Sequence, residues 1–191
     1  IDEESMPTSF TEIKDYLECP MKYKFRKIYG FSPAVPELFG FGLTTHTAIN
    51  KLHQAYQNKP PSRGEAEEIA QDTFHLKHVF PSRHPEREGP YERARNASKR
   101  IVGEYAEGYP NDFTQSRSLE QRFEIKANKA LITGSIDLLL REDDQGNILE
   151  AKVIDFKSMD YPEHHRNPLF WINLSLQVQL YAYAAVVVLG E

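Results

Sequence analysis

The sequence has little of several features that define protein classes. A single cysteine, Cys19, excludes an internal disulfide framework and fits a reducing cytoplasm. We find no uninterrupted apolar run of about 18 residues and no basic, apolar leader, so we expect neither a membrane span nor a signal peptide. A phosphate-binding loop of the G-x-x-x-x-G-K-[ST] kind is also missing, so any ATP-driven motor must lie on another segment or chain.

What is present is typical of a soluble globular protein. The 191 residues are 40% hydrophobic and 27% charged, enough for one domain with its own core. The chain begins with Ile1 rather than Met and stops just after the apolar run 184–189, so we expect a domain excised from a longer protein. Repeats and low-complexity segments are absent from the sequence.

The net charge of −5 is not typical of a protein that coats DNA nonspecifically. Basic residues are nevertheless clustered, and local basic faces can hold phosphates while acids make the total negative. Two solvated helix faces are an equally good interpretation of either cluster alone. The clusters are Lys14, Lys22, Lys24, Arg26 and Lys27, and Arg93, Arg95, Lys99 and Arg100.

Hydrophobic spacing predicts a helical first half and an extended second half. Residues 1–8 are a disordered or extended lead, and residues 9–191 form one domain, mainly helical over 9–110. A β-sheet core covers 115–158, and the polar loop 159–168 carries His164, His165 and Arg166. Helices are predicted at 9–19, 20–28, 38–57, 65–79, 90–108 and 169–189, and strands at 119–125, 131–140 and 149–157.

Two apolar runs joined by the turn Asp143–Asn147 predict a β-hairpin in the middle of this sheet. Asp137 interrupts the first run, where an isolated buried carboxylate is costly unless it is paired or binds a metal. In strand geometry Asp155 and Lys157 project from the same face. Two carboxylates beside a lysine predict a site for a divalent cation that suits phosphodiester hydrolysis. A surface hairpin with a cross-strand ion pair is the alternative.

Histidines are the other candidate ligands. His46 lies in the predicted helix 38–57, which also carries His53, and a structural histidine bound to a neighbour is the simpler interpretation of His46. His75, His78 and His84 lack the Cys/His spacing of zinc sites, so we interpret them as solvated or structural.

Six motifs, in order, resemble those of the RecB-like nucleases of the PD-(D/E)XK superfamily, a domain fused to repair helicases such as the AddA/AddB pair and UvrD-like proteins. The resemblance covers residues 8–189 and is much more specific than any single motif. The motifs are Tyr16 to Tyr23 (Y-x-x-C-P-x-x-Y), Gly42 to His46 (G-x-x-x-H), Glu120 to Phe123 (E-x-x-F), Gly134 to Asp137 (G-x-x-D), Asp155 to Lys157 (D-x-K) and Gln177 to Tyr181 (Q-x-x-x-Y).

The resemblance implies a restriction-endonuclease-like α/β fold, in which helices flank a small mixed central sheet and 169–189 is a packing helix. It also implies roles for individual residues. Asp137 and Asp155 bind Mg²⁺ or Mn²⁺, Lys157 is the catalytic lysine, and Gln177 and Tyr181 orient the lysine or contact the DNA backbone. Further metal ligands are His46, the Phe156 carbonyl and, more weakly, Glu120.

Cys19 marks a departure from this family. Several members place a cysteine at this point and three more beyond the final helix, which together hold an iron–sulfur cluster of about four thiolates. This chain has one cysteine, so we expect no cluster unless it is completed outside these residues.

The expected function is therefore a metal-dependent deoxyribonuclease, an exonuclease on single-stranded ends that acts with a helicase in repair or recombination. The expected location is a bacterial-type cytoplasm, at the nucleoid. A nuclease-like module that binds DNA without cutting it is the second hypothesis. A protein unrelated to nucleic acids, with a structural ion pair at the hairpin, is the third.

Overall fold

The computed structural model of the chain describes residues 6–32, 34, 36–84, 86–144, 147–157 and 168–189. The chain forms two compact units, of which the first contains residues 1–33, 117–155 and 160–191. The second unit contains residues 34–116 and 156–159, so the chain passes from one unit to the other between Asp155 and Phe156. Each unit is described by itself.

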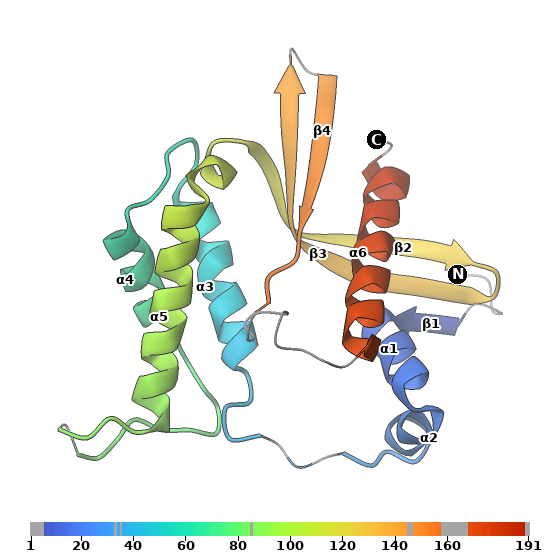
Figure 1. Ribbon diagram of the computed structural model, residues 1–191, viewed down its shortest axis with the longest axis horizontal. Helices are drawn as coiled ribbons and strands as arrows, with labels where there is room; N and C mark the ends of the chain where they lie inside the picture. The colour runs from blue at the N-terminus through green and yellow to red at the C-terminus, as the bar shows by residue number, and fades with distance from the viewer. Residues whose placement is uncertain are drawn as a thin grey trace. The chain divides into compact units, whose positions relative to one another are not determined.

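The first unit is built on a four-stranded sheet with strand β3 (Ala130–Asp144) at its centre (Figure 1). Early in β3, β1 (Met6–Ser9) pairs with it in parallel, from Met6 opposite Ala130 to Ser9 opposite Thr133. Later in β3, β4 (Asn147–Ile154) pairs with it antiparallel, and β2 (Ser116–Ala127) is its other neighbour. The sheet is therefore mixed, as the sequence predicts.

Helices α1 (Phe10–Glu18) and α6 (Pro168–Leu189) pack on this sheet. Phe123, Ile136, Leu139 and Tyr181 are among the buried residues of the core between β2, β3 and α6. Gly134 is required at its position on β3, because a Cβ atom there would lie 2.5 Å from the Cζ atom of Phe123. This contact explains the glycine of the G-x-x-D motif.

The N-terminal helical segment continues from α1 into a short helix, α2 (Pro20–Tyr23), and a π-helical turn, η1 (Lys24–Ile28). Helix α1 begins where Ser9 and Glu12 form a reciprocal capping box. Pro20 takes the first position of α2, where a missing N–H has no cost. The predicted helices on either side of Pro20 are thereby confirmed.

The second unit is a helical bundle of α3 (Phe41–Ala55), α4 (Arg63–Thr73) and α5 (Pro90–Gly108), followed by a 3₁₀ turn, η2 (Pro110–Phe113) (Figure 1). Helix α5 has the predicted bounds, since Pro90 opens it and the Gly89 N–H donates to the Glu92 carboxylate at 2.9 Å. Leu52, Val102 and Phe113 are completely buried in its main core.

Several boundaries differ from the prediction. Residues 6–9 form β1, whose polar sequence carries no strand signal of its own. Helix α4 ends at Thr73 instead of 79, because Phe74, Leu76 and Val79 are buried in a separate apolar cluster outside the helix. Strand β3 reaches Asp144 and pairs with Asn147, so the predicted turn is shorter, and its residues 145–146 lie outside the described ones.

The most consequential difference is the end of β4 at Ile154. The prediction that Asp155 and Lys157 share one face of a strand is wrong, because residues 155–157 have no regular secondary structure. Of the predicted loop 159–168, only Pro168 is among the described residues, and it begins α6. His164, His165 and Arg166 lie outside them.

Helix α6 is long and apolar enough to cross a membrane by length and composition alone, with a mean hydropathy of 1.2 over Phe170–Val187. This is weak evidence for a span, because core helices of soluble proteins meet the same criterion. Polar residues recur along it, and Tyr181, Ala184 and Ala185 are buried against the sheet.

Candidate active site

Two candidate metal ligands lie at the end of the β3–β4 pair. Leu138 lies opposite Ile154 in the antiparallel register. Asp137 directly precedes Leu138, and Asp155 directly follows Ile154 where β4 has ended, so the backbone brings the two aspartates to the same end of this strand pair. Both aspartates are half-buried, at the place where β4 ends.

Helix α6 holds one of these carboxylates. The Gln177 Nε2 group donates to Asp155 Oδ1 at 3.1 Å and to the Tyr181 hydroxyl oxygen at 2.9 Å. The prediction that Gln177 and Tyr181 share a helix face is therefore confirmed, and the face is turned toward Asp155. One amide thus fixes the orientation of the carboxylate and of the phenol.

The Tyr181 side chain is only 8% exposed. Burial raises the pKa of its phenol, because a phenolate would be poorly solvated. The negative charges of Asp155, Asp137 and Glu120 raise this pKa further, against the hydrogen bond from Gln177, which lowers it. All three acids therefore act on Tyr181, which stays protonated at neutral pH.

Glu120 occupies an unusual place on β2. Its φ is +49°, in the left-handed region that a residue with a Cβ rarely adopts. Its carboxylate accepts a hydrogen bond from Ser135 Oγ at 3.1 Å, and Ser135 lies on the same face of β3 as Asp137. Strained backbone of this kind costs of the order of 1–3 kcal/mol and clusters at functional sites.

Lys157, His46 and Phe156 belong to the second unit. They line a cavity of about 110 Å³ together with Thr45, Ile49, Ile101 and Tyr105. The His46 and Phe156 rings meet edge to face, with centroids 5.9 Å apart. Lys157 is exposed, and Phe156 packs half-buried against the helical core. The middle residue of the D-x-K motif is thus an apolar anchor.

A buried polar chain lies beneath this anchor. Tyr105 packs edge to face on Phe156 at 5.2 Å and donates its hydroxyl proton to Asp112 Oδ2 at 3.0 Å. Because that proton is used, His53 Nε2, 2.8 Å from the same hydroxyl, must be the donor to Tyr105. His53 and Asp112 are only 1% and 4% exposed. His53 is therefore a structural histidine of the helical core.

Sequence reasoning missed Tyr105 and Asp112 entirely. The two share no motif, and Tyr105 lies 52 residues from its partner His53.

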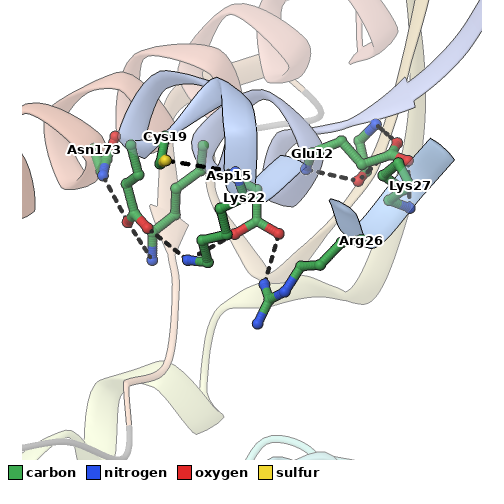
Figure 2. A network of polar contacts seen from close by, with 10 residues as sticks. Glu12, Asp15, Cys19, Lys22, Arg26, Lys27 and Asn173 are labelled. Carbon is green, nitrogen blue, oxygen red and sulfur yellow. Dashed lines mark hydrogen bonds and ion pairs between the residues drawn. The ribbon is translucent and has the colours of Figure 1, made fainter. Parts of the chain in front are cut away.

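The first basic cluster is largely paired with acids of its own segment (Figure 2). Arg26 binds Asp15 at 2.8 Å, and Lys22 binds Glu18 at 3.1 Å. Further ion pairs join Lys22 to Asp15, Lys14 to Glu18 and Lys27 to Glu12. The hydrogen bond to Glu18 raises the pKa of Lys22. Most cations of this cluster are therefore paired with acids. They form neither a surface of unpaired cations for phosphates nor a helix face whose charges contact only solvent.

Cys19 is exposed, and its Sγ accepts the Lys22 N–H at 3.4 Å, which caps α2. In the second basic cluster, Lys99 binds Gln71 and Arg93 binds the Glu88 carbonyl. Neither cluster presents a row of unpaired cations.

Among the residues that the structure describes, no group of three or more His, Cys, Asp or Glu side chains is gathered in a metal-binding arrangement. Two carboxylates at one end of a strand pair are nevertheless compatible with a hard cation, because Mg²⁺ commonly takes one or two carboxylates and completes its shell with water and substrate phosphate. Asp137 and Asp155 are the donor pair that meets this requirement.

One family model covers nearly the whole chain. The family model described as PD-(D/E)XK nuclease superfamily matches residues 7–190. The chain belongs to this superfamily. Its mixed sheet with flanking helices is accordingly restriction-endonuclease-like, and the predicted fold class is confirmed. None of the curated proteins compared with the chain matches it.

Membership in the PD-(D/E)XK superfamily makes the chain a nuclease domain by family, and it implies DNA as the partner and Mg²⁺ or Mn²⁺ as the typical cofactor. Asp137 stands on the central strand and Asp155-Phe156-Lys157 directly follows the next strand, in the order of the superfamily's signature.

Proposed function

We propose that this chain is a RecB-like, metal-dependent deoxyribonuclease that cuts single-stranded ends. It works beside a helicase, in the same or another chain, in DNA repair or recombination, in a bacterial-type cytoplasm at the nucleoid. The observation that supports the proposal is the end of the β3–β4 register, where Asp137 and Asp155 each lie one residue beyond the Leu138–Ile154 pair and Gln177 donates to Asp155. The ordered series of motifs supports the RecB-like subtype and the helicase.

In this proposal Asp137 and Asp155 hold the divalent cation. The Phe156 carbonyl, His46 and Glu120 are further candidate ligands, on the strength of the sequence resemblance. When bound, the cation lowers the pKa of a water and stabilises negative charge on the phosphoryl oxygens. Cys19 supplies one thiolate where an iron–sulfur cluster needs about four, so no cluster is proposed for this chain.

The remaining groups position and neutralise charge. Gln177 keeps the Asp155 carboxylate oriented, and the protonated Tyr181 can donate a hydrogen bond to a carboxylate or a phosphate. The Lys157 ammonium orients the attacking water or adds positive charge as the phosphodiester breaks, which is most effective in the transition state. The water forms the new bond to phosphorus, and the 5′ or 3′ oxygen leaves.

The deciding experiment is strand-resolved cleavage of end-labelled single- and double-stranded DNA with Mg²⁺ or Mn²⁺, beside EDTA. Lys157→Ala, Asp137→Ala and Asp155→Ala are expected to abolish cleavage, by about 1000-fold or more, while circular dichroism shows a folded protein. Metal-dependent cleavage in the parent that is lost in these variants supports the proposal, and the label position gives the polarity.

If the three variants cut at the parent rate, the active-site assignment is wrong. If the folded parent binds DNA but cuts nothing with either metal, the second hypothesis, a DNA-binding module without catalysis, replaces the first.

A further inference from the structure

The N-terminal helical segment, residues 10–32, exposes an unusual amount of apolar surface. None of the residues in α1, α2 or η1 is buried. Contiguous exposed apolar patches on soluble proteins mark binding surfaces. The large exposed side chains of this segment are Tyr16, Leu17, Met21, Phe25, Ile28, Tyr29 and Phe31.

Three of these rings form one cluster, and the local backbone builds it. In the π-helical turn the Tyr29 N–H donates to the Lys24 carbonyl at 3.2 Å. Gly30 follows at φ +71°, which only glycine adopts readily, and the Phe31 N–H then bonds back to the Phe25 carbonyl at 3.0 Å. Single π-helical turns occur frequently at functional sites.

The result is a set of adjoining rings turned to solvent. The Phe25 centroid lies 5.8 Å from that of Tyr29 and 5.6 Å from that of Phe31. The three side chains are 45–63% exposed, although a folded chain would ordinarily bury rings of this size. We call Lys24, Phe25, Tyr29 and Phe31 the aromatic cluster.

The charges around the aromatic cluster favour an anionic partner. Residues 10–32 carry five basic and three acidic side chains, a surplus of two positive charges in a chain of net charge −5. The three acids and four of the five cations form ion pairs within the segment, several of which Figure 2 shows, so an approaching phosphate meets the net surplus of positive charge. Lys24 Nζ lies 5.5 Å from the Tyr29 ring centroid, in a cation–π contact.

We infer that the aromatic cluster binds unpaired bases of single-stranded nucleic acid, with Lys24 near the backbone phosphates. Exposed rings next to cations suit this ligand because every base offers a flat face for stacking, whereas the bases of a duplex are already stacked on one another. The inference deepens the proposed function and rests on it for the nature of the substrate. A protein partner on the same surface is the outcome that would replace it.

The test measures binding without cleavage. A 5′-fluorescein oligothymidylate of about 12 nucleotides is titrated with the full chain in EDTA at fixed salt, and fluorescence anisotropy gives the affinity. An abasic oligomer of equal length supplies the same phosphates without bases. The variants are Phe25→Ala, Tyr29→Ala and Phe31→Ala, and Phe80→Ala, 80% exposed in the second unit, is the matched control.

Each alanine variant of the cluster is expected to weaken oligothymidylate binding by about 5- to 150-fold, the range of one lost base–aromatic stack. Phe25→Trp retains a flat ring and keeps the parent affinity. Binding of the abasic oligomer is expected to be weak and indifferent to all these changes, and Phe80→Ala to bind as the parent does.

Unchanged oligothymidylate affinity in all three alanine variants overturns the inference, and so does equal binding of the abasic oligomer. The result is separate from the fate of the proposed function. A parent that cuts DNA while the variants bind normally refutes only the aromatic cluster, whereas ring-dependent binding by a parent that never cuts refutes only the nuclease activity.

Discussion

Two adjacent residues of the D-x-K motif, Asp155 (here the hydrogen-bonded end) and Phe156 (the packed end), are held by different kinds of interaction. Asp155 is held in the first unit by one hydrogen bond from the Gln177 amide on α6. Phe156, the next residue, is held in the second unit by the rings of His46 and Tyr105 and by the helical core. A hydrogen bond sets the direction of a carboxylate, whereas packing sets the position of the backbone. Changes at the two ends should therefore have separable effects on activity and stability.

The largest expected effect on stability is at the packed end. Phe156→Ala removes a ring that contacts two others and the core, and large-to-small changes in cores cost about 2–4 kcal/mol. We expect urea unfolding to show a loss of this size, with cleavage falling because Lys157 loses its adjacent anchor.

Phe156→Leu is the control, since it keeps an apolar side chain and should restore most of the stability. If the Phe156→Ala variant unfolds at the same urea concentration as the parent, Phe156 is not an anchor. The difference proposed between the packed end and the hydrogen-bonded end is then wrong.

At Asp155, the hydrogen-bonded end, we expect a substitution to lower activity rather than stability. Gln177→Leu replaces one good helix former by another but removes the hydrogen-bond donor to Asp155. Loss of a group that orients a metal ligand typically costs 10- to 100-fold in metal affinity or activity. We expect the Mn²⁺ concentration for half-maximal cleavage to rise, with the free energy of unfolding within about 1 kcal/mol of the parent.

Gln179→Leu is the matched control on the same helix, because Gln179 is exposed and bonds only to Ser175 among the described contacts. Equal metal dependence in the Gln177 and Gln179 variants would show that the amide has no part in positioning Asp155.

The same contrast explains what the sequence could and could not predict. Local signals were sufficient for α5, with its opening proline, and for the face shared by Gln177 and Tyr181, because helix periodicity depends on neighbours a few positions apart. The turn residues between two apolar runs were sufficient for the β3–β4 hairpin, which brings Asp137 and Asp155 to the same end of the strand pair.

The sequence predictions that failed concern residues whose structure depends on partners far away in the sequence. Strand β1 exists because β3 supplies a parallel neighbour more than a hundred residues away, and no pattern in Met6–Ser9 records that pairing. The hydrophobic pattern Ile154-Asp155-Phe156 looks like a strand that continues, yet Phe156 packs half-buried against the core of the helical unit instead, and β4 ends before it. Alternation predicts which residues are apolar partners, but not in which core they are buried.

The smallest of the three effects is expected inside the second unit. Tyr105→Phe keeps the ring that packs on Phe156 and removes only the hydroxyl that joins His53 to Asp112. Leaving a buried donor and a buried acceptor without this partner costs about 1–3 kcal/mol, partly offset if a water replaces the hydroxyl. We expect a loss of stability near 1–2 kcal/mol in urea unfolding, with metal dependence of cleavage unchanged, because Phe156 keeps its ring contact.

Tyr109→Phe provides the comparison, since Tyr109 stacks on Tyr105 but is exposed, and a surface change of this kind should stay within about 0.5 kcal/mol. Equal unfolding of the two variants would mean that the buried chain contributes nothing to the packed end. A contrary result would be a shift in the Mn²⁺ dependence of cleavage by Tyr105→Phe in the way expected for Gln177→Leu. Packing around Phe156 would then also orient the metal ligands, and the separation between effects on stability and effects on activity would be wrong.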